Sequence, residues 1–88
     1  MSAIVKLSNR LTESEMNDEV VIMRVDNGEF FSLAETAATI WRMIDGKRDR
    51  AELAAAVASE LALRESEIQA DVDEFVTELA EAGLVAER

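Results

Sequence analysis

The side chains most able to do chemistry in this 88-residue chain are acidic, and they gather toward its C-terminal end. Between Glu65 and Glu87 the sequence contains no Lys or Arg, and Asp71, Asp73 and Glu74 stand close together. Such carboxylates could hold a divalent cation, but on a helix Asp71 and Asp73 would point about 200° apart. The sequence also lacks the spacing of a calcium-binding loop. We therefore expect no metal site.

The residue types that most enzymes use are missing from the sequence. It contains no His, no Cys and no Tyr, which removes imidazole bases, thiolate nucleophiles and the usual zinc ligands. The serines have no partner base other than Lys6 or Lys47, and neither lysine stands in a recognisable motif. The three glycines are scattered and form no phosphate-binding loop. We expect a protein that is not an enzyme and binds no cofactor.

Composition indicates one small globular domain over residues 1–88. Hydrophobic residues make up 49% of the chain, enough for a packed core. The lack of Cys fits a reducing compartment. The first residues lack the apolar stretch of a signal peptide, and no run reaches membrane-span length. We therefore expect a cytoplasmic protein that does not enter membranes.

The charge balance bears on the partners. Nine Lys and Arg against 19 Asp and Glu give a formal net charge of −10, which repels nucleic-acid phosphates and anionic lipids. A helix-turn-helix in the helical half would present an acidic helix to DNA, so we expect no nucleic-acid binding. The acidic stretch is either a solvated helix face or a surface that attracts a basic peptide or protein.

The elements that would position any site begin with three predicted strands. β-branched and aromatic residues fill residues 3–7, 19–25 and 29–33, with a polar connection between the first two. The dipeptide Asn27-Gly28 is typical of a two-residue type I′ turn between the last two strands.

That turn would pair Val25 with Phe30 and Ile22 with Leu33. The two faces of the hairpin would then carry Val20, Ile22, Phe31 and Leu33 on one side and Val21, Met23, Val25 and Phe30 on the other. Because both faces are apolar, we expect helices, the N-terminal strand or another chain to cover them. A second copy of this chain is one such cover, so a homodimer is possible.

The rest of the chain predicts helices over about 34–45, 50–61 and 67–82. Capping-box patterns precede them, namely Ser32-x-x-Glu35, Asp49-x-x-Glu52 and Ser66-x-x-Gln69. Helical periodicity places the following residues on buried stripes: Ala37, Ile40, Trp41, Ile44, Leu53, Val57, Leu61, Ile68, Val72, Phe75 and Leu79. The expected fold class is α+β, a small N-terminal antiparallel three-stranded sheet packed on three C-terminal helices in a winged-helix-like arrangement.

The stretches "GEFFSLAETAATIWRMIDGKRDRAELAAAVASEL" and "ESEIQADVDEFVTELAEAGLV" resemble the PqqD-like family of recognition elements for ribosomally made, post-translationally modified peptides. The resemblance spans nearly the whole chain and rests on the order and spacing of several short features. They are the Gly28-to-Leu33 strand, Thr36-Ala37, Ile40-Trp41, Asp45-Gly46, the Asp71-Val72…Phe75…Leu79 pattern and Gly83-Leu84.

The resemblance implies that a precursor's leader peptide adds as an extra strand to the third strand and lies between it and the third helix. A partner enzyme of peptidase, cyclase or radical SAM type would then modify the core peptide. Strand addition supplies affinity through backbone hydrogen bonds and selectivity through pockets for alternate side chains. The implied leader-binding residues are Glu29, Phe30, Phe31, Ser32, Asp71, Val72, Phe75 and Val76.

Each of these residues has an ordinary structural alternative. Phe31, Val72 and Phe75 fall on the apolar stripes and can be core residues, whereas Phe30 and Val76 lie off the stripes and are better pocket candidates. Asp71 either meets a basic or polar leader group or favours the positive N-terminal end of its helix.

One position departs from the family pattern, since Ala34 follows Leu33 where the family usually has Asn. This removes a helix cap, which Ser32 and Glu35 could replace. The Ile40-Trp41 pair is closer to relatives found with lasso-peptide and related systems than to the chaperone of pyrroloquinoline quinone synthesis. That chaperone and a structural or regulatory protein-binding subunit remain the alternative functions.

Overall fold

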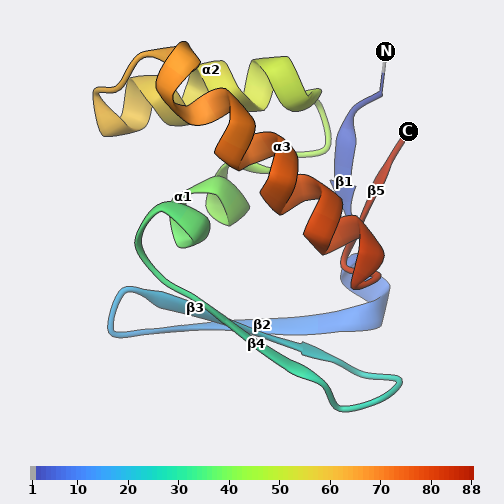
Figure 1. The fold of residues 1–88 in the computed structure, drawn as a ribbon. Helices are drawn as coiled ribbons and strands as arrows, with labels where there is room; N and C mark the ends of the chain where they lie inside the picture. Colours follow the sequence, from blue (N-terminus) through green and yellow to red (C-terminus); the bar gives the residue numbers. More distant parts are fainter. Residues whose placement is uncertain (1) are drawn as a thin grey trace.

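The computed structural model describes residues 2–88 and places a three-stranded sheet beneath three helices (Figure 1). The elements in chain order are β1 (Ile4–Lys6), the 3-10 turn η1 (Ser8–Arg10), β2 (Leu11–Met16), β3 (Glu19–Arg24), β4 (Phe30–Leu33), α1 (Glu35–Met43), α2 (Arg50–Leu61), α3 (Glu65–Glu81) and β5 (Val85–Glu87). Strands β2, β3 and β4 form the antiparallel sheet in that order. The α+β prediction, with a three-stranded antiparallel sheet and three helices, is confirmed.

The membership of that sheet differs from the prediction. Residues 3–7 do not join it, because β1 pairs instead with β5 in a separate two-stranded sheet. The third member is β2, which lies in the segment predicted to be a polar connection. The strand has no hydrophobic alternation to reveal it, since Leu11 is its one buried residue. The sequence signal for β2 is the Asn17-Asp18 turn that follows it. Both φ angles there are positive, at 52° and 68°, as a type I′ hairpin requires.

The β3–β4 hairpin has a wider loop than the sequence predicts. Met23, not Val25, lies opposite Phe30, and Val20 lies opposite Leu33. The loop widens because the N–H of Val25 donates to the Arg10 carbonyl at 3.0 Å, which holds Val25 beside β2 rather than β4.

The shift leaves the predicted faces of the hairpin intact. A register change of two residues does not exchange the two sides of a strand. Val20 and Ile22 are fully buried beneath the helices, whereas Phe30 and Met23 share the face that no helix of residues 2–88 covers (Figure 1).

The helix ends show which capping signals act. At α2 the Asp49 carboxylate accepts the Glu52 N–H at 2.8 Å and the Glu52 carboxylate accepts the Asp49 N–H at 2.9 Å, so this capping box forms. The Ser32 box does not form, since the Ser32 hydroxyl lies in β4 and donates to Glu19 at 2.8 Å. The Ser66 box also fails, because α3 begins at Glu65 and encloses that serine.

The helix α1 is shorter than the predicted range 34–45. It ends at Met43, and its N-cap Ala34 has no side-chain oxygen to accept a hydrogen bond. Glu35 follows with a φ of 55°, a left-handed conformation that costs a non-glycine residue about 1–2 kcal/mol. The strand-to-helix junction is therefore strained at Glu35, directly after the uncapped Ala34.

One hydrophobic core joins the sheet to all three helices. Its largest fully buried side chains are Trp41, Ile4, Ile22, Leu53, Leu84, Val20, Val57, Val72 and Val76. Phe31 and Phe75 pack against this core while remaining partly exposed. The two aromatic rings thus lie at the margin of the core, one on β4 and one on α3.

Candidate functional site

The strand β4 is an edge of the three-stranded sheet and is four residues long. The N–H of Arg24 donates to the Glu29 carbonyl at 2.9 Å, which fixes the alternation of hydrogen bonds along the β3–β4 ladder. By that alternation Phe31 and Leu33 bond to β3, whereas Phe30 and Ser32 direct their N–H and C=O groups to the open edge.

The side chains of β4 alternate between two environments. Phe30 is 67% exposed and lies opposite Met23 on the helix-free face of the sheet. Phe31 lies opposite the buried Ile22, under the helices, and is half-buried against the core. Ser32 is exposed on the outer face, and Glu29 precedes the strand as an exposed loop residue.

The helix wall differs from the prediction at two neighbouring positions. Val76, predicted to be a pocket residue, is fully buried, as is Val72. Phe75, predicted to lie on the core stripe, is only partly buried. A helical period of 3.6 allows either residue 75 or residue 76 to follow Val72, and in the folded protein, where α3 packs against α2, the smaller Val76 is the buried one. Phe75 and Asp71 remain as accessible residues of this wall.

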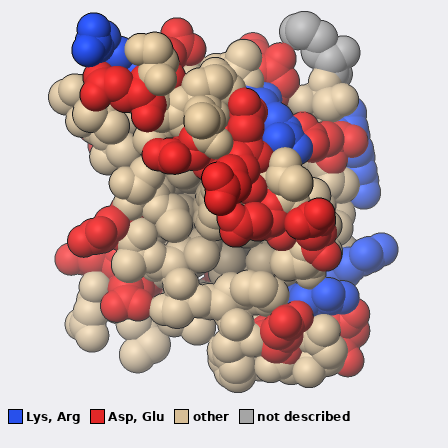
Figure 2. Space-filling model, in the orientation of Figure 1, with Lys and Arg blue, Asp and Glu red and all other residues tan. Residues whose placement is uncertain are grey.

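Asp71 lies beyond the first turn of α3, where the attraction of the helix dipole has already fallen off. The first turn instead carries Glu65 and Glu67. Asp71 is exposed and forms no ion pair within residues 2–88. Figure 2 shows further acidic side chains gathered over α3.

Arg24 ties the hairpin to the end of α3. Its Nη1 donates to the Ala82 carbonyl at 2.9 Å, which caps the helix C-terminus with a positive charge. Gly83 has a φ of 77°, and a Cβ there would stand 3.2 Å from the same Nη1. The chain therefore needs glycine at this position for both its backbone angle and the approach of Arg24. This contact fixes the hairpin relative to α3.

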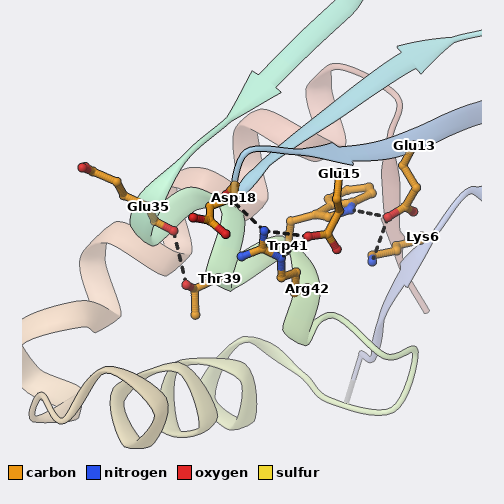
Figure 3. A network of polar contacts seen from close by, with 8 residues as sticks. All are labelled: Lys6, Glu13, Glu15, Asp18, Glu35, Thr39, Trp41 and Arg42. Carbon is orange, nitrogen blue, oxygen red and sulfur yellow. Dashed lines mark hydrogen bonds and ion pairs between the residues drawn. The ribbon is translucent and has the colours of Figure 1, made fainter.

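A polar network that the sequence did not predict joins β2 to α1 (Figure 3). The buried Trp41 donates from Nε1 to the Glu13 carboxylate at 3.1 Å, and the Lys6 ammonium lies 4.4 Å from the Trp41 ring centroid. Burial lowers the pKa of Lys6, opposed by the nearby carboxylates of Glu13 and Glu15. The sequence signal for this network was the pair of acidic residues Glu13 and Glu15, which could pair with a helical Trp. Both residues occupy the inner face of β2.

Arg42 of α1 forms the opposite end of this network. Its Nε and Nη2 both donate to the Glu15 carboxylate, at 3.1 and 2.8 Å, and Nη2 also reaches the Asp18 carbonyl at 3.1 Å. Glu13 and Glu15 are thus held inward by α1, although β2 is itself a sheet edge.

A shallow, open depression of about 270 Å³ lies away from β4 and is lined by Val5, Lys6, Ser8, Ile44, Asp45 and Gly46. Within residues 2–88 no three His, Cys, Asp or Glu residues come together as a metal site. Across the same residues, no helix combines the length and apolarity needed to cross a membrane.

Comparison with known proteins identifies the family. The family model described as coenzyme PQQ synthesis protein D (PqqD) matches residues 19–85. The chain belongs to the PqqD family. The matched range contains β3, β4 and all three helices, and therefore both sides of the candidate site.

A PqqD-like arrangement of elements also appears in a solved structure described as TbiB1 in complex with the TbiA(beta) leader peptide. It is 24% identical, with a TM-score of 0.78, and the alignment covers 91% of this chain and 93% of that one. At this identity the likeness establishes the fold. No curated protein matches the sequence.

Proposed function

We propose that this chain binds the leader segment of a ribosomally made precursor peptide along the open edge of β4 and presents it to a modifying enzyme. The observation that carries the proposal is the uncharged edge Phe30–Leu33, with free backbone groups at Phe30 and Ser32, in a member of the PqqD family. The peptide-bound state of the similar TbiB1 structure supports it.

The sheet has a second edge, β2, and its side chains argue against peptide binding there. Glu13 and Glu15 point inward beside Ile22 and Val20 and are held by α1. Inward-pointing charges on an edge strand are a known protection against strand addition. The β4 edge has no such charge. The peptide is therefore expected at β4, not at β2.

The role is one of binding, not of catalysis. PqqD-like peptide-binding partners are generally non-catalytic, and the sequence offers no His, Cys or Tyr for acid–base or nucleophilic chemistry. The modifying enzyme would be of peptidase, cyclase or radical SAM type, with a lasso-peptide pathway as one candidate. Such a role belongs in the cytoplasm, where precursors are synthesised.

One specific alternative is favoured by the family description, which names coenzyme PQQ synthesis. In that case the peptide would be the precursor of that coenzyme. The two versions share the β4 edge and differ in the peptide that binds with higher affinity.

The backbone hydrogen bonds can be tested with a proline. Ser32→Pro removes the N–H that faces the open edge and leaves the bonds of Phe31 and Leu33 to β3 in place. Ser32→Ala keeps that N–H and serves as the matched control. The probe is a synthetic N-terminal half of each short peptide encoded beside this gene.

We expect Ser32→Pro to weaken binding of the recognised peptide at least tenfold in calorimetry, and Ser32→Ala to bind within about twofold of the wild type. Circular dichroism checks that both variants fold. Equal affinity of a folded proline variant would exclude strand addition at this edge, and the protein-binding-subunit alternative would then be preferred.

A further inference from the structure

The outer face of β4 offers a contact that the helix side does not. Phe30 is 67% exposed on the helix-free face of the sheet, beside Met23, although it belongs to a paired strand. Residues directly opposite each other on neighbouring strands point to the same face. A peptide strand added to β4 must therefore place one side chain beside Phe30 on the outer face and the next beside Phe31 on the helix side.

The position beside Phe30 and the position beside Phe31 form two subsites. Both are apolar, but they differ in how deeply a peptide side chain would be buried. Phe31 on β4 and Phe75 on α3 are each half-buried against the same core, so a side chain beside Phe31 would lie on the helix-covered side of the sheet. Phe30 is exposed and the neighbouring Met23 is half-buried, so together they form a shallow apolar surface on which a side chain would lie flat. An exposed Phe beside a Met on one face of a sheet gains from an apolar cross-strand neighbour.

We propose that the leader peptide is recognised on both faces of the sheet and carries two consecutive apolar residues, the first against Phe30 and the second against Phe31 and Phe75. This inference rests on the proposed function and adds to it the class of peptide. Recognition on the helix side alone would require apolar residues only at every second position.

The charges on the exposed flank of α3 and just before β4 bear on the polar residues of the same peptide. Asp71, Phe75 and Glu78 are spaced by four and three residues and therefore lie on one flank of α3. The other flank is occupied, since Arg50 donates at 2.9 Å to the Asp73 carbonyl and to the Thr77 hydroxyl.

No Lys or Arg of residues 2–88 pairs with Asp71 or Glu78. Glu29 adds a third carboxylate just before Phe30. Charge complementarity therefore favours Lys or Arg around the apolar pair and disfavours Asp and Glu.

The test is a selection from a random 12-residue peptide library displayed on yeast, against the wild type and against Ser32→Pro. Peptides lost with Ser32→Pro define the edge-dependent set. We expect two adjacent apolar residues with Lys or Arg nearby in that set. Edge-dependent peptides with apolar residues only at alternate positions, or rich in acidic residues, would overturn this inference and leave the proposed function standing. No edge-dependent peptide at all would overturn both.

A double-mutant cycle then separates the outer subsite from general packing. Alanine at the outer apolar position of one selected peptide should weaken its binding to the wild type about two- to fivefold. The same peptide change should have no effect on Phe30→Ser, provided that thermal unfolding shows this variant to be folded. An equal loss in both proteins would overturn recognition on the outer face.

Discussion

At the scale of single residues, Phe30 and Phe75 are aromatic side chains that the fold does not fully bury. Phe30 is 67% exposed, and Phe75 is half-buried while its neighbour Val76 is fully buried. The sequence could predict that Phe30 lies off the core, because its strand alternates. It could not choose between Phe75 and Val76, because both positions fit a 3.6-residue period after Val72 and only the packing of α3 decides.

Replacing Phe30 with Asp should weaken leader-peptide binding about tenfold or more, because it removes an apolar contact and adds a carboxylate beside Glu29. Stability should change little, since the side chain is largely exposed in the free protein. Fluorescence anisotropy with a labelled leader peptide measures the affinity.

The matched control is Val25→Asp, which adds the same charge at a residue that is 55% exposed but lies outside β4. Its affinity should stay within about threefold of the wild type. Unchanged affinity of Phe30→Asp would remove Phe30 from the binding site.

At the scale of elements, local sequence signals predicted a helix or strand correctly where an apolar pattern or a cap acts within one segment. The Asp49 capping box lies at the start of α2, and that helix spans Arg50–Leu61. The strand β2 could not be found from hydrophobicity, because Glu13 and Glu15 occupy its inner face and are satisfied by α1. The hydrogen-bond partners of Glu13 and Glu15 lie on α1, so these two residues are explained by tertiary contacts and not by a pattern within β2.

The uncapped start of α1 predicts a stabilising substitution. Ala34→Asn restores an N-cap oxygen at an exposed position with an extended φ of −131° and should stabilise the protein by about 1 kcal/mol. Ala55→Asn, at an exposed position inside α2, should instead destabilise it slightly. Denaturation with urea measures both, and a destabilised Ala34→Asn would show that the junction cannot accept a regular cap.

The ion pair between Arg50 and Glu87 predicts a pH dependence. The guanidinium donates to both Glu87 oxygens, at 2.9 and 2.8 Å, and this hydrogen bonding lowers the pKa of Glu87 and raises the pKa of Arg50. A carboxyl with a lowered folded-state pKa stabilises the protein above its unfolded pKa of about 4.3. That contribution is lost as the pH falls below about 4.3 and through the folded pKa.

Glu87→Gln should therefore be about 0.5–1 kcal/mol less stable than the wild type at pH 7, as expected for a partly exposed pair. The difference should disappear as the pH is lowered through and below the pKa of Glu87. Unfolding curves at a series of pH values measure it. A difference that stays constant down to low pH would show that the pair acts through packing rather than charge.

At the scale of the whole molecule, the helices cover one face of the sheet and leave the other open (Figure 1). Met16, Val25 and Phe30 are 62%, 55% and 67% exposed near or on that open face. The sequence predicted a hairpin that is apolar on both sides and therefore needs a cover. Among residues 2–88 the helices provide that cover on the inner side, so the outer side is left for the leader-peptide side chain proposed at Phe30 and, in the peptide-free protein, for a second copy.

We expect weak self-association through this face that strengthens with salt, because a net charge of −10 on each copy opposes it at low ionic strength. Met16→Glu should reduce the association. Sedimentation velocity over a wide range of concentrations measures it. A strictly monomeric protein under all these conditions would exclude a second copy as a cover of this face and leave the leader peptide and the modifying enzyme.

The proposed function depends most on strand addition at β4, and amide hydrogen exchange tests that addition most directly. In the free protein the N–H groups of Phe30 and Ser32 face the open edge, whereas those of Phe31 and Leu33 already bond to β3. Addition of the leader peptide should slow exchange at Phe30 and Ser32 and leave the other two nearly unchanged. Slowed exchange at the β2 edge instead, or none along β4 with a peptide that binds, would contradict it.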